Sequence, residues 1–348
     1  MSKFPAPIIK KPQASVRLTD VAKMVGVSTA TVSRALANPE SVSPATRKTI
    51  LDAVRKAGYT PNVAARNLRV RHTKMVLVVV SQISNVVFAG VLSGIDEELN
   101  LHGYGLIIGH LDNKPEREEH FIKMALSGAV DGILLLSLRR LPQGHGLTML
   151  DARLPMVALN EKLEGASFPQ ITVNDRAAVH EIIKHLYDLG HRRFGHIAGP
   201  DHNYTGLERR HGFTEAVTKL GLDPASAPVW QGNYAFEDGA VFGPLFMQMQ
   251  PRPTAIFAAN DEMAIGFIKY IQQQGLRVPQ DVSVVGFDGI AYAKYLSPTL
   301  TSVVQPRREI GRAAALLLVK QLRGETVTAD VELGATLMLG ESTGPVKA

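Results

Sequence analysis

The sequence predicts a small all-α head followed by a large α/β body that is divided into two lobes. Helical periodicity and helix-capping residues run through residues 18–58, whereas apolar runs alternate with amphipathic stretches from residue 75 onward. About 274 of the 348 residues follow the head. This length exceeds what a single hydrophobic core usually serves, so the body should form two lobes.

The first part of the head has the signature of a helix-turn-helix. A first helix is predicted by one apolar stripe, which comprises Leu18, Val21, Ala22 and Val25. Gly26 follows at the position where a positive φ costs least, and Ser28 is suited to cap a second helix over residues 29–37. The inner face of this second helix is predicted to be Val32, Ala35 and Leu36. Two helices joined by a short turn that contains Gly form a helix-turn-helix.

A third helix is predicted to complete the head. Ser43 supplies its cap, and Pro44 occupies the first helical position, where proline is favoured. Gly58 is expected to end the helix. Its buried side is predicted to comprise Ile50, Leu51, Val54 and Ala57.

In a helix-turn-helix, the second helix enters the major groove of DNA and its N-terminal residues meet the base edges. Thr29 and Ala30 come first, so they are the candidates for base discrimination through hydroxyl or methyl contacts. Thr31 and Ser33 are better suited to bind phosphate, and Arg34 can read a guanine edge or a phosphate. The alternative is that these are ordinary solvated residues of a small helical bundle.

The charge distribution favours binding to nucleic acid. Residues 1–74 hold 14 Lys or Arg and 3 Asp or Glu, which gives a net charge of +11. The other residues hold 24 basic and 29 acidic side chains, a net charge of −5. The overall charge of +6 therefore conceals a basic head on a mildly acidic body, as expected of a head that binds phosphates.

Continuous apolar runs in the body predict buried strands. These runs cover residues 75–81, 104–111, 132–137, 155–160, 193–199, 255–260 and 282–288. Helical patterns between them cover residues 89–101, 177–189, 206–220, 262–274 and 307–323. Apolar strands that are separated by helices favour parallel sheets covered on both faces.

The head resembles the DNA-binding head of the LacI/GalR family of bacterial transcription regulators in three segments: LTDVAKMVGVSTATVSRALAN, VSPATRKTILDAVRKAGYTPN and VAARNLR. The likeness continues through the body. It implies a flexible arm (1–15), a helix-turn-helix domain (16–60), a hinge helix with linker (61–74), and a ligand-binding and dimerisation domain (75–348). It also implies Rossmann-like lobes of the periplasmic-binding-protein type, over about 75–172 with 306–334 and about 173–304 with 335–348.

The resemblance gives the segment after Asn62 a specific role. In the family this segment forms a hinge helix when two protomers meet on the operator, and the leucine at the place of Leu68 is wedged into the minor groove. An apolar wedge unstacks a base step, and the bent duplex then contacts more protein. A basic linker is the alternative. The further DNA-binding residues implied by the resemblance are Thr19, Ser28, Asn62, Arg66 and Arg69.

Polar residues stand where the predicted strands of the body end, which is where open parallel sheets bind ligands. They are Ser81, Asn85, Asn160, Asn260 and Asp288, whose directional donors and acceptors suit hydroxyl-rich ligands. By the family's motifs, Arg209 would hold a carboxylate, phosphate or hydroxyl, and Tyr234 would offer an aromatic wall. Phe88 and Gln305 are further candidates, whereas Asp261 is expected to cap the helix that follows it.

Two departures from the family's pattern bear on the ligand. An acidic residue often stands at the place of Asn160 in sugar-binding members, and SNVVF, after the first strand, lacks the proline and paired aromatics that are common there. We expect a sugar, a polyol or a sugar-derived acid as the effector. A purine or nucleoside is the alternative.

Little in the sequence supports catalysis, a metal or a cofactor. The dinucleotide and P-loop motifs GxGxxG and GxxxxGK[ST] are absent. The chain has no cysteine, and its 11 histidines are spread out, with His191 and His196 not at the helical spacing of metal ligands. No stretch reaches the ~20 apolar residues of a membrane span, and residues 1–15 lack the core of a signal peptide, so we expect a cytoplasmic protein.

The sequence therefore favours a transcriptional regulator, most simply a repressor, whose operator affinity is controlled by an effector bound between the lobes. The tail lacks leucine heptads, so a homodimer on a pseudo-palindromic operator is the default assembly. A solute-binding protein with the same body is one alternative, which the basic head disfavours. A Rossmann-like enzyme such as a sugar-modifying dehydrogenase is another.

Overall fold

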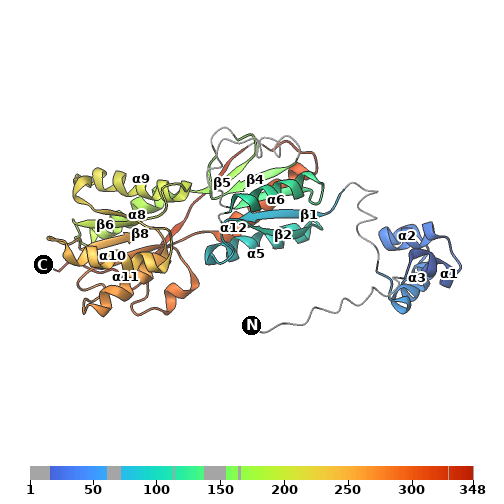
Figure 1. The fold of residues 1–348 in the computed structure, drawn as a ribbon, viewed down its shortest axis with the longest axis horizontal. Coiled ribbons are helices and arrows are strands. Elements are labelled where there is room, and N and C mark those ends of the chain that lie inside the picture. The colour runs from blue at the N-terminus through green and yellow to red at the C-terminus, as the bar shows by residue number, and fades with distance from the viewer. Residues whose placement is uncertain are drawn as a thin grey trace, which may run out of the picture. The chain divides into compact units, whose positions relative to one another are not determined.

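The computed structural model describes residues 16–60, 72–112, 114–136, 154–163, 166–327 and 329–347. The chain forms two compact units, Met1–His72 and Thr73–Ala348. The first contains the helical head and the second contains the α/β body (Figure 1). The predicted DNA contacts Asn62, Arg66, Leu68 and Arg69 lie outside the described residues, as does the N-terminal arm.

The head has the predicted helices and caps. It comprises α1 (Leu18–Val25), α2 (Thr29–Ala37), η1 (Pro39–Ser41) and α3 (Pro44–Ala57). Gly26 and Gly58 end α1 and α3 in the left-handed conformation, with φ of 71° and 62°. The Ser28 hydroxyl accepts a hydrogen bond from the Thr31 backbone N–H at 3.1 Å, and Ser43 caps α3 through Thr46 in the same way. These caps fix where each helix begins.

Three helices enclose the small core of the head. Val21, Val32, Ala35 and Ile50 are buried there. The prediction for Leu51 is wrong, because this side chain is 36% exposed. Ala53 packs against the core instead, since the helical repeat places residues three, four and seven positions after Ile50 on one face.

The first lobe of the body contains a wholly parallel sheet of strand order β11-β5-β4-β3-β1-β2. Its strands are β1 (Met75–Val80), β2 (Gly105–His110), β3 (Gly132–Leu136), β4 (Met156–Leu159), β5 (Gln170–Val173) and β11 (Val331–Leu333). Helices α5 (Val86–Leu101) and α12 (Arg307–Leu322) cover one face, and α6 (Pro115–Leu126) covers the other. Burial on both faces explains why β1 is a continuous apolar run.

The second lobe repeats this architecture with strand order β12-β10-β9-β8-β6-β7. Its strands are β6 (Phe194–Ala198), β7 (Val229–Gln231), β8 (Ala255–Ala258), β9 (Ser283–Asp288), β10 (Thr301–Val304) and β12 (Thr336–Met338). Helices α8 (Asp175–Asp188) and α9 (Tyr204–Lys219) cover one face, and α10 (Phe236–Gln248) and α11 (Asp261–Gln273) cover the other (Figure 1). Only β12 departs from the expected parallel arrangement, since it pairs antiparallel with β10.

The predicted fold class is confirmed, and the elements that the sequence patterns missed have physical reasons. Strands β5, β7, β10, β11 and β12 have three or four residues each, which is too few for a periodic pattern. Helix α10 contains Pro244, and α6 is rich in charged residues. No helix among the described residues is long and apolar enough to cross a membrane.

The chain passes between the two sheets three times: after β5, after β10, and between β11 and β12. Two of these crossings are tied to each other. The Asn174 backbone N–H donates to the Leu333 carbonyl at 3.0 Å, and its side-chain amide donates to Glu332 Oε2 at 2.7 Å. The crossings thus form a connected strip that joins the lobes.

Candidate functional site

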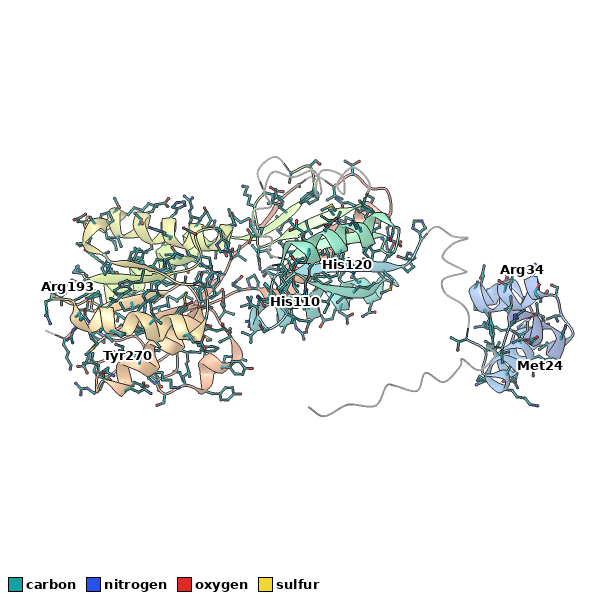
Figure 2. The ribbon with its side chains drawn as sticks, in the orientation of Figure 1. Met24, Arg34, His110, His120, Arg193 and Tyr270 are labelled. Carbon is teal, nitrogen blue, oxygen red and sulfur yellow. The ribbon has the colours of Figure 1, made fainter. Side chains whose placement is uncertain are left out.

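The N-terminal part of α2 presents the predicted base-reading residues to solvent. Thr29, Ala30 and Arg34 are exposed, and Figure 2 shows Arg34 at the surface of the head. Thr31 is half-buried, and its hydroxyl lies 2.8 Å from the Ser28 hydroxyl. Ser33 is also half-buried, whereas Thr19 and Ser28 are exposed. Of the predicted α2 contacts, Thr29, Ala30 and Arg34 are therefore the most accessible.

The body contains a cleft of about 540 Å³, and all nine predicted effector contacts line it. The first lobe contributes Ser81, Asn85, Phe88 and Asn160. The second lobe contributes Arg209, Tyr234, Asn260 and Asp288, and Gln305 comes from the crossing after β10. Ser81, Asn160 and Asn260 come just after the ends of β1, β4 and β8, while Asp288 is the last residue of β9. The parallel strands therefore bring these polar groups together at their carboxyl ends.

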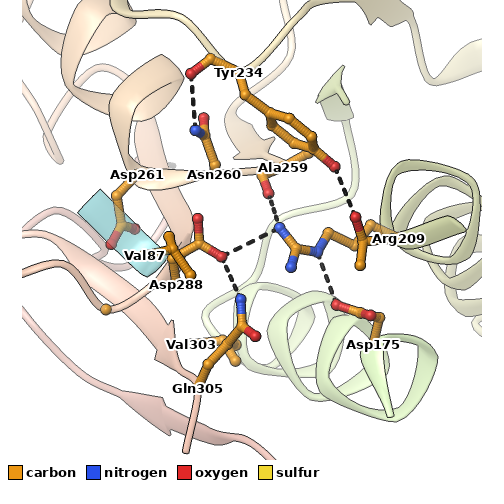
Figure 3. A network of polar contacts seen from close by, with 12 residues as sticks. Val87, Asp175, Arg209, Tyr234, Ala259, Asn260, Asp261, Asp288, Val303 and Gln305 are labelled. Carbon is orange, nitrogen blue, oxygen red and sulfur yellow. Dashed lines mark hydrogen bonds and ion pairs between the residues drawn. The ribbon is translucent and has the colours of Figure 1, made fainter. Parts of the chain in front are cut away.

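A buried guanidinium lies at the centre of the polar contacts in the second lobe (Figure 3). Arg209 Nε donates to Asp175 Oδ1 at 2.8 Å, and Nη1 donates to the Ala259 carbonyl at 2.6 Å and to Asp288 Oδ1 at 3.3 Å. The Cζ atom of Arg209 lies over the Phe287 ring, 3.7 Å from the ring centroid. Burial alone would lower the pKa of Arg209, but Asp175 and Asp288 outweigh it and hold this pKa above its usual value. Arg209 is thus a charged group whose Nε and Nη1 are both bonded within the protein.

Asp288 is held in its unusual conformation by several partners. Its φ is 107°, in a region that non-glycine residues rarely adopt. Gln305 Nε2 donates to Asp288 Oδ1 at 2.6 Å, alongside Arg209. Beneath the following loop, Asp261 accepts the Ile290 N–H at 2.7 Å and the Ser302 hydroxyl at 2.5 Å. These hydrogen bonds fix the conformation of the loop and therefore the direction of the Asp288 carboxylate.

The expectation that Asp261 caps α11 is wrong by one residue. Asn260 is the cap: its Oδ1 accepts the Met263 N–H at 3.0 Å, and its amide donates to the Tyr234 carbonyl at 3.0 Å. Asp261 is the first helical residue and is fully buried. Burial first, and then the charge of Asp288, raises the pKa of Asp261 to about 8. Asn260 therefore caps the helix, while Asp261 holds the loop that follows Asp288.

Strained backbone is concentrated at the cleft. Asn160, Tyr234 and Asp288 have φ of 58°, 69° and 107°. Asn160 Oδ1 is buried and has no hydrogen-bond partner within the described part of the chain. The Tyr234 ring requires glycine at position 199, because a Cβ there would lie 2.4 Å from the ring. Such conformations cost energy and are found where a site demands them.

Sequence reasoning missed several polar lining residues. They are Gln82, Ser84, Glu161, His202, Asn203, Thr205, Asn233, Glu237 and Glu262. Glu161 is buried, and its Oε2 accepts the Tyr204 N–H at 3.3 Å. Glu161 and Glu262 stand within two residues of predicted contacts, so neighbouring positions at the strand ends were the available signal. Within the described residues, no group of three or more His, Asp or Glu side chains is arranged to hold a metal ion.

Comparison with known families gives two matches. Residues 17–62 match bacterial regulatory proteins of the lacI family, and residues 183–343 match the periplasmic binding protein-like domain. The HTH-type transcriptional repressor CytR of Escherichia coli (strain K12) is 36% identical over 318 residues, which cover 91% of this chain and 93% of CytR. Catabolite control protein A of Priestia megaterium is 31% identical over 318 residues, covering 91% of this chain and 96% of that protein.

Solved structures have the same fold. A lac repressor dimer bound to operator and the anti-inducer ONPF superposes with a TM-score of 0.86 at 24% identity, covering 95% of this chain and 99% of the repressor chain. The transcriptional regulator CelR in complex with cellobiose superposes with a TM-score of 0.72 at 32% identity. That match covers 94% of this chain and 99% of CelR.

Proposed function

The chain belongs to the lacI family of bacterial regulatory proteins, and from this premise we propose that it is a sequence-specific repressor controlled by a small polar effector. One observation carries the proposal: a single chain joins an exposed helix-turn-helix surface to a two-lobed body with a polar cleft. The head recognises DNA, and the cleft binds the effector. Since a solute-binding protein has no use for the head, the repressor accounts for the whole chain.

The DNA contacts divide into two kinds. Thr29 and Ala30 read base edges at the start of α2, and Arg34 reads a guanine edge or a phosphate. Thr31, Ser33, Thr19 and Ser28 position the helix on the phosphate backbone. Asn62, Arg66, Leu68 and Arg69 act in the hinge, with Leu68 as the minor-groove wedge. Binding to chromosomal operators places the protein in the cytoplasm.

The assembly on DNA is a homodimer on a pseudo-palindromic operator. One recognition helix per half-site matches the two-fold symmetry of such a site. The lac repressor in the superposed structure is a dimer bound to operator, which supports the same assembly here. The effector changes the balance between two arrangements of the lobes, and thereby operator affinity.

The effector is a hydroxyl-rich molecule such as a sugar, a polyol or a sugar acid. Asn160, Asn260 and Asp288 offer directional hydrogen bonds to hydroxyl groups, and the related CelR was solved with cellobiose. A purine or nucleoside is the second candidate. The observation that favours it is the aromatic lining of the cleft by Phe88 and Tyr234. Both are binding functions, and neither requires a cofactor.

Selection of operator DNA tests the proposal. The full chain is incubated with fragments of the source genome, and bound fragments are sequenced. We expect a pseudo-palindromic site that binds at physiological salt at least about a thousandfold more tightly than bulk DNA. Arg34→Ala should weaken binding to the selected site by tenfold or more, whereas Arg55→Ala, an exposed position on α3, serves as the control. Equal affinity for all fragments would overturn the proposal.

A further inference from the structure

The cleft carries an excess of negative charge. Its lining includes four carboxyl groups, those of Glu161, Glu237, Glu262 and Asp288. The same lining contains one guanidinium, that of Arg209, and no lysine among the described residues. The second lobe also holds the buried Asp175 directly behind Arg209. Among the described lining residues, carboxyl groups therefore outnumber the side chains of lysine and arginine.

Arg209 does not offset this excess for a ligand. Its guanidinium pairs with both Asp175 and Asp288, at 2.8 and 3.3 Å, so two carboxylates already balance its single charge. The side chain is 4% exposed and lies against Phe287. Nη2 has no hydrogen bond to the described residues, but an anion bound there would meet a guanidinium whose charge two carboxylates already balance. Drawing the guanidinium away from them would leave a buried carboxylate unpaired, which is costly.

The ionisation of Glu262 responds to two of these carboxyl groups. Glu262 is half-buried in the first turn of α11, where a helix normally favours a carboxylate. Burial first, and then the charges of Asp288 and Glu237, nevertheless raise the pKa of Glu262 to about 7. Burial opposes a charge of either sign, but the contribution of Asp288 and Glu237 also opposes an anionic group on a ligand.

Two acceptor atoms in the lining of the cleft have no hydrogen-bond partner among the described residues. The Asp288 side chain is only 8% exposed, and its Oδ1 receives both Arg209 and Gln305. In Figure 3 both of these bonds end on Oδ1, and no residue drawn there bonds to Oδ2. Asn160 Oδ1 is likewise buried without a partner in the described chain. Both atoms call for hydroxyl or amino donors on the ligand.

We infer that the cleft accepts uncharged or amine-bearing polyhydroxyl ligands and excludes anionic ones, such as sugar acids, sugar phosphates and nucleotides. The inference rests on the proposed function, whose effector class it narrows. Hydroxyl and amino groups satisfy the free acceptors, and a cationic amine also gains from the nearby carboxylates. Among the described lining residues, an anionic group meets several carboxyl groups and no lysine or arginine that is free of carboxylate partners.

The field can be measured without knowing the effector. The chain contains no cysteine, so a single cysteine provides a unique reactive thiol. We would place it on either wall as Ser84→Cys or Asn233→Cys, both exposed lining residues, with the exposed Ser127→Cys as the control outside the lining. Each full-length variant is treated separately with a cationic and an anionic methanethiosulfonate of similar size. The ratio of the two rates cancels differences in thiol pKa and accessibility.

The expected ratio of cationic to anionic rates is at least about tenfold higher at the cleft cysteines than at Ser127→Cys. This excess should shrink in high salt and when Glu237→Gln and Glu262→Gln are added to the cleft variants. A ratio equal to or below that of the control overturns the inference. Binding of a fully ionised sugar acid or phosphate, lost on mutation of lining residues, would overturn it as well.

This experiment is independent of the test of the proposed function. Thiol reactivity reports only the charge of the cleft, whereas operator selection reports only DNA recognition. If the cleft is negative but the chain selects no operator, the inference about charge stands and the proposal of a repressor fails. If the chain selects an operator but the cleft is not negative, the proposal of a repressor stands and the inference that anionic effectors are excluded fails.

Discussion

The two walls of the cleft are built differently. In the second lobe, Arg209, Asp288, Asn260 and Tyr234 are joined to one another, or to buried neighbours, by short hydrogen bonds and ion pairs. In the first lobe, Asn85 only caps its own helix, and the side-chain oxygen of Asn160 has no partner among the described residues. The wall formed by the second lobe is therefore held by hydrogen bonds before any ligand binds. The wall formed by the first lobe keeps the Asn160 oxygen without a partner among the described residues.

This difference gives the two lobes different tasks. A preorganised wall loses little conformational freedom on binding, so it can set the position of the ligand. A wall with unused acceptors gains its partners from the ligand, so its position relative to the first wall depends on occupancy. Gln305 lies in the crossing after β10 and bonds to Asp288. This crossing between the lobes is therefore tied directly to the wall formed by the second lobe. Substitutions in the second lobe should therefore affect folding, and those in the first lobe should affect binding.

The largest expected effect follows from removing the central cation of the rigid wall. Arg209→Ala leaves Asp175 and Asp288 buried without their partner, which should lower the unfolding free energy of the body by about 3–5 kcal/mol. Arg176→Ala is the control, because Arg176 also pairs with two carboxylates but is 40% exposed. Its loss should cost about 1 kcal/mol or less. Urea unfolding measures both, and similar losses would remove the contrast between buried and exposed pairs.

The support beneath Asp288 predicts a dependence on pH. Burial and Asp288 raise the pKa of Asp261 to about 8, so the folded state holds a proton that the unfolded carboxyl releases near its ordinary pKa. The stabilisation is complete below that ordinary pKa and is lost as pH rises through about 8. Asp261→Asn stays neutral, so the wild type should lose about 1–3 kcal/mol relative to the variant between pH 5 and 7. A constant difference in unfolding free energy across this range would contradict the assignment.

The sequence was sufficient for the positions of the cleft residues but insufficient for their pairings. Parallel strands end at a common edge of their sheet, so the polar residues at the ends of β1 and β4 could be expected to meet, as could those at the ends of β8 and β9. The pairing of Arg209 with Asp175 joins helices α8 and α9 and depends on how they pack. No periodic pattern records such packing. For the same reason, the family's motifs suggested Arg209 as a contact for a carboxylate, phosphate or hydroxyl but could not reveal its pairing with Asp175 and Asp288.

The smaller errors have the same origin. Leu51 was assigned to the core of the head from its apolar character, but the helical repeat turns it outward. Asp261 was assigned as a cap because acidic residues favour that position, and Asn260 competes for it equally well. Local propensity identifies the segment in which a role is filled. Tertiary contacts decide which neighbouring residue fills it.

A third prediction tests how closely the rigid wall is packed. A Cβ at Gly199 would lie 2.4 Å from the Tyr234 ring, so Gly199→Ala should displace this ring and cost about 1–2 kcal/mol. Gly334→Ala is the matched control, because no atom lies within 4 Å of a Cβ built there. Its effect on urea unfolding should stay within about 0.5 kcal/mol. An unchanged stability for Gly199→Ala would mean that the Tyr234 side chain moves freely.

The smallest effect on stability is expected at Asn160 in the first lobe, and there a pair of variants separates backbone from side chain. Asn160 has a φ of 58°, which alanine tolerates poorly and glycine tolerates freely. Asn160→Ala should cost about 1 kcal/mol, and Asn160→Gly should stay within about 0.5 kcal/mol of the wild type. Both variants remove the free Oδ1, so both should weaken effector binding by a similar factor in calorimetric titration. If Asn160→Gly instead destabilises the body as strongly as Arg209→Ala, the first wall is as firmly bonded as the second, and the division of tasks between the lobes fails.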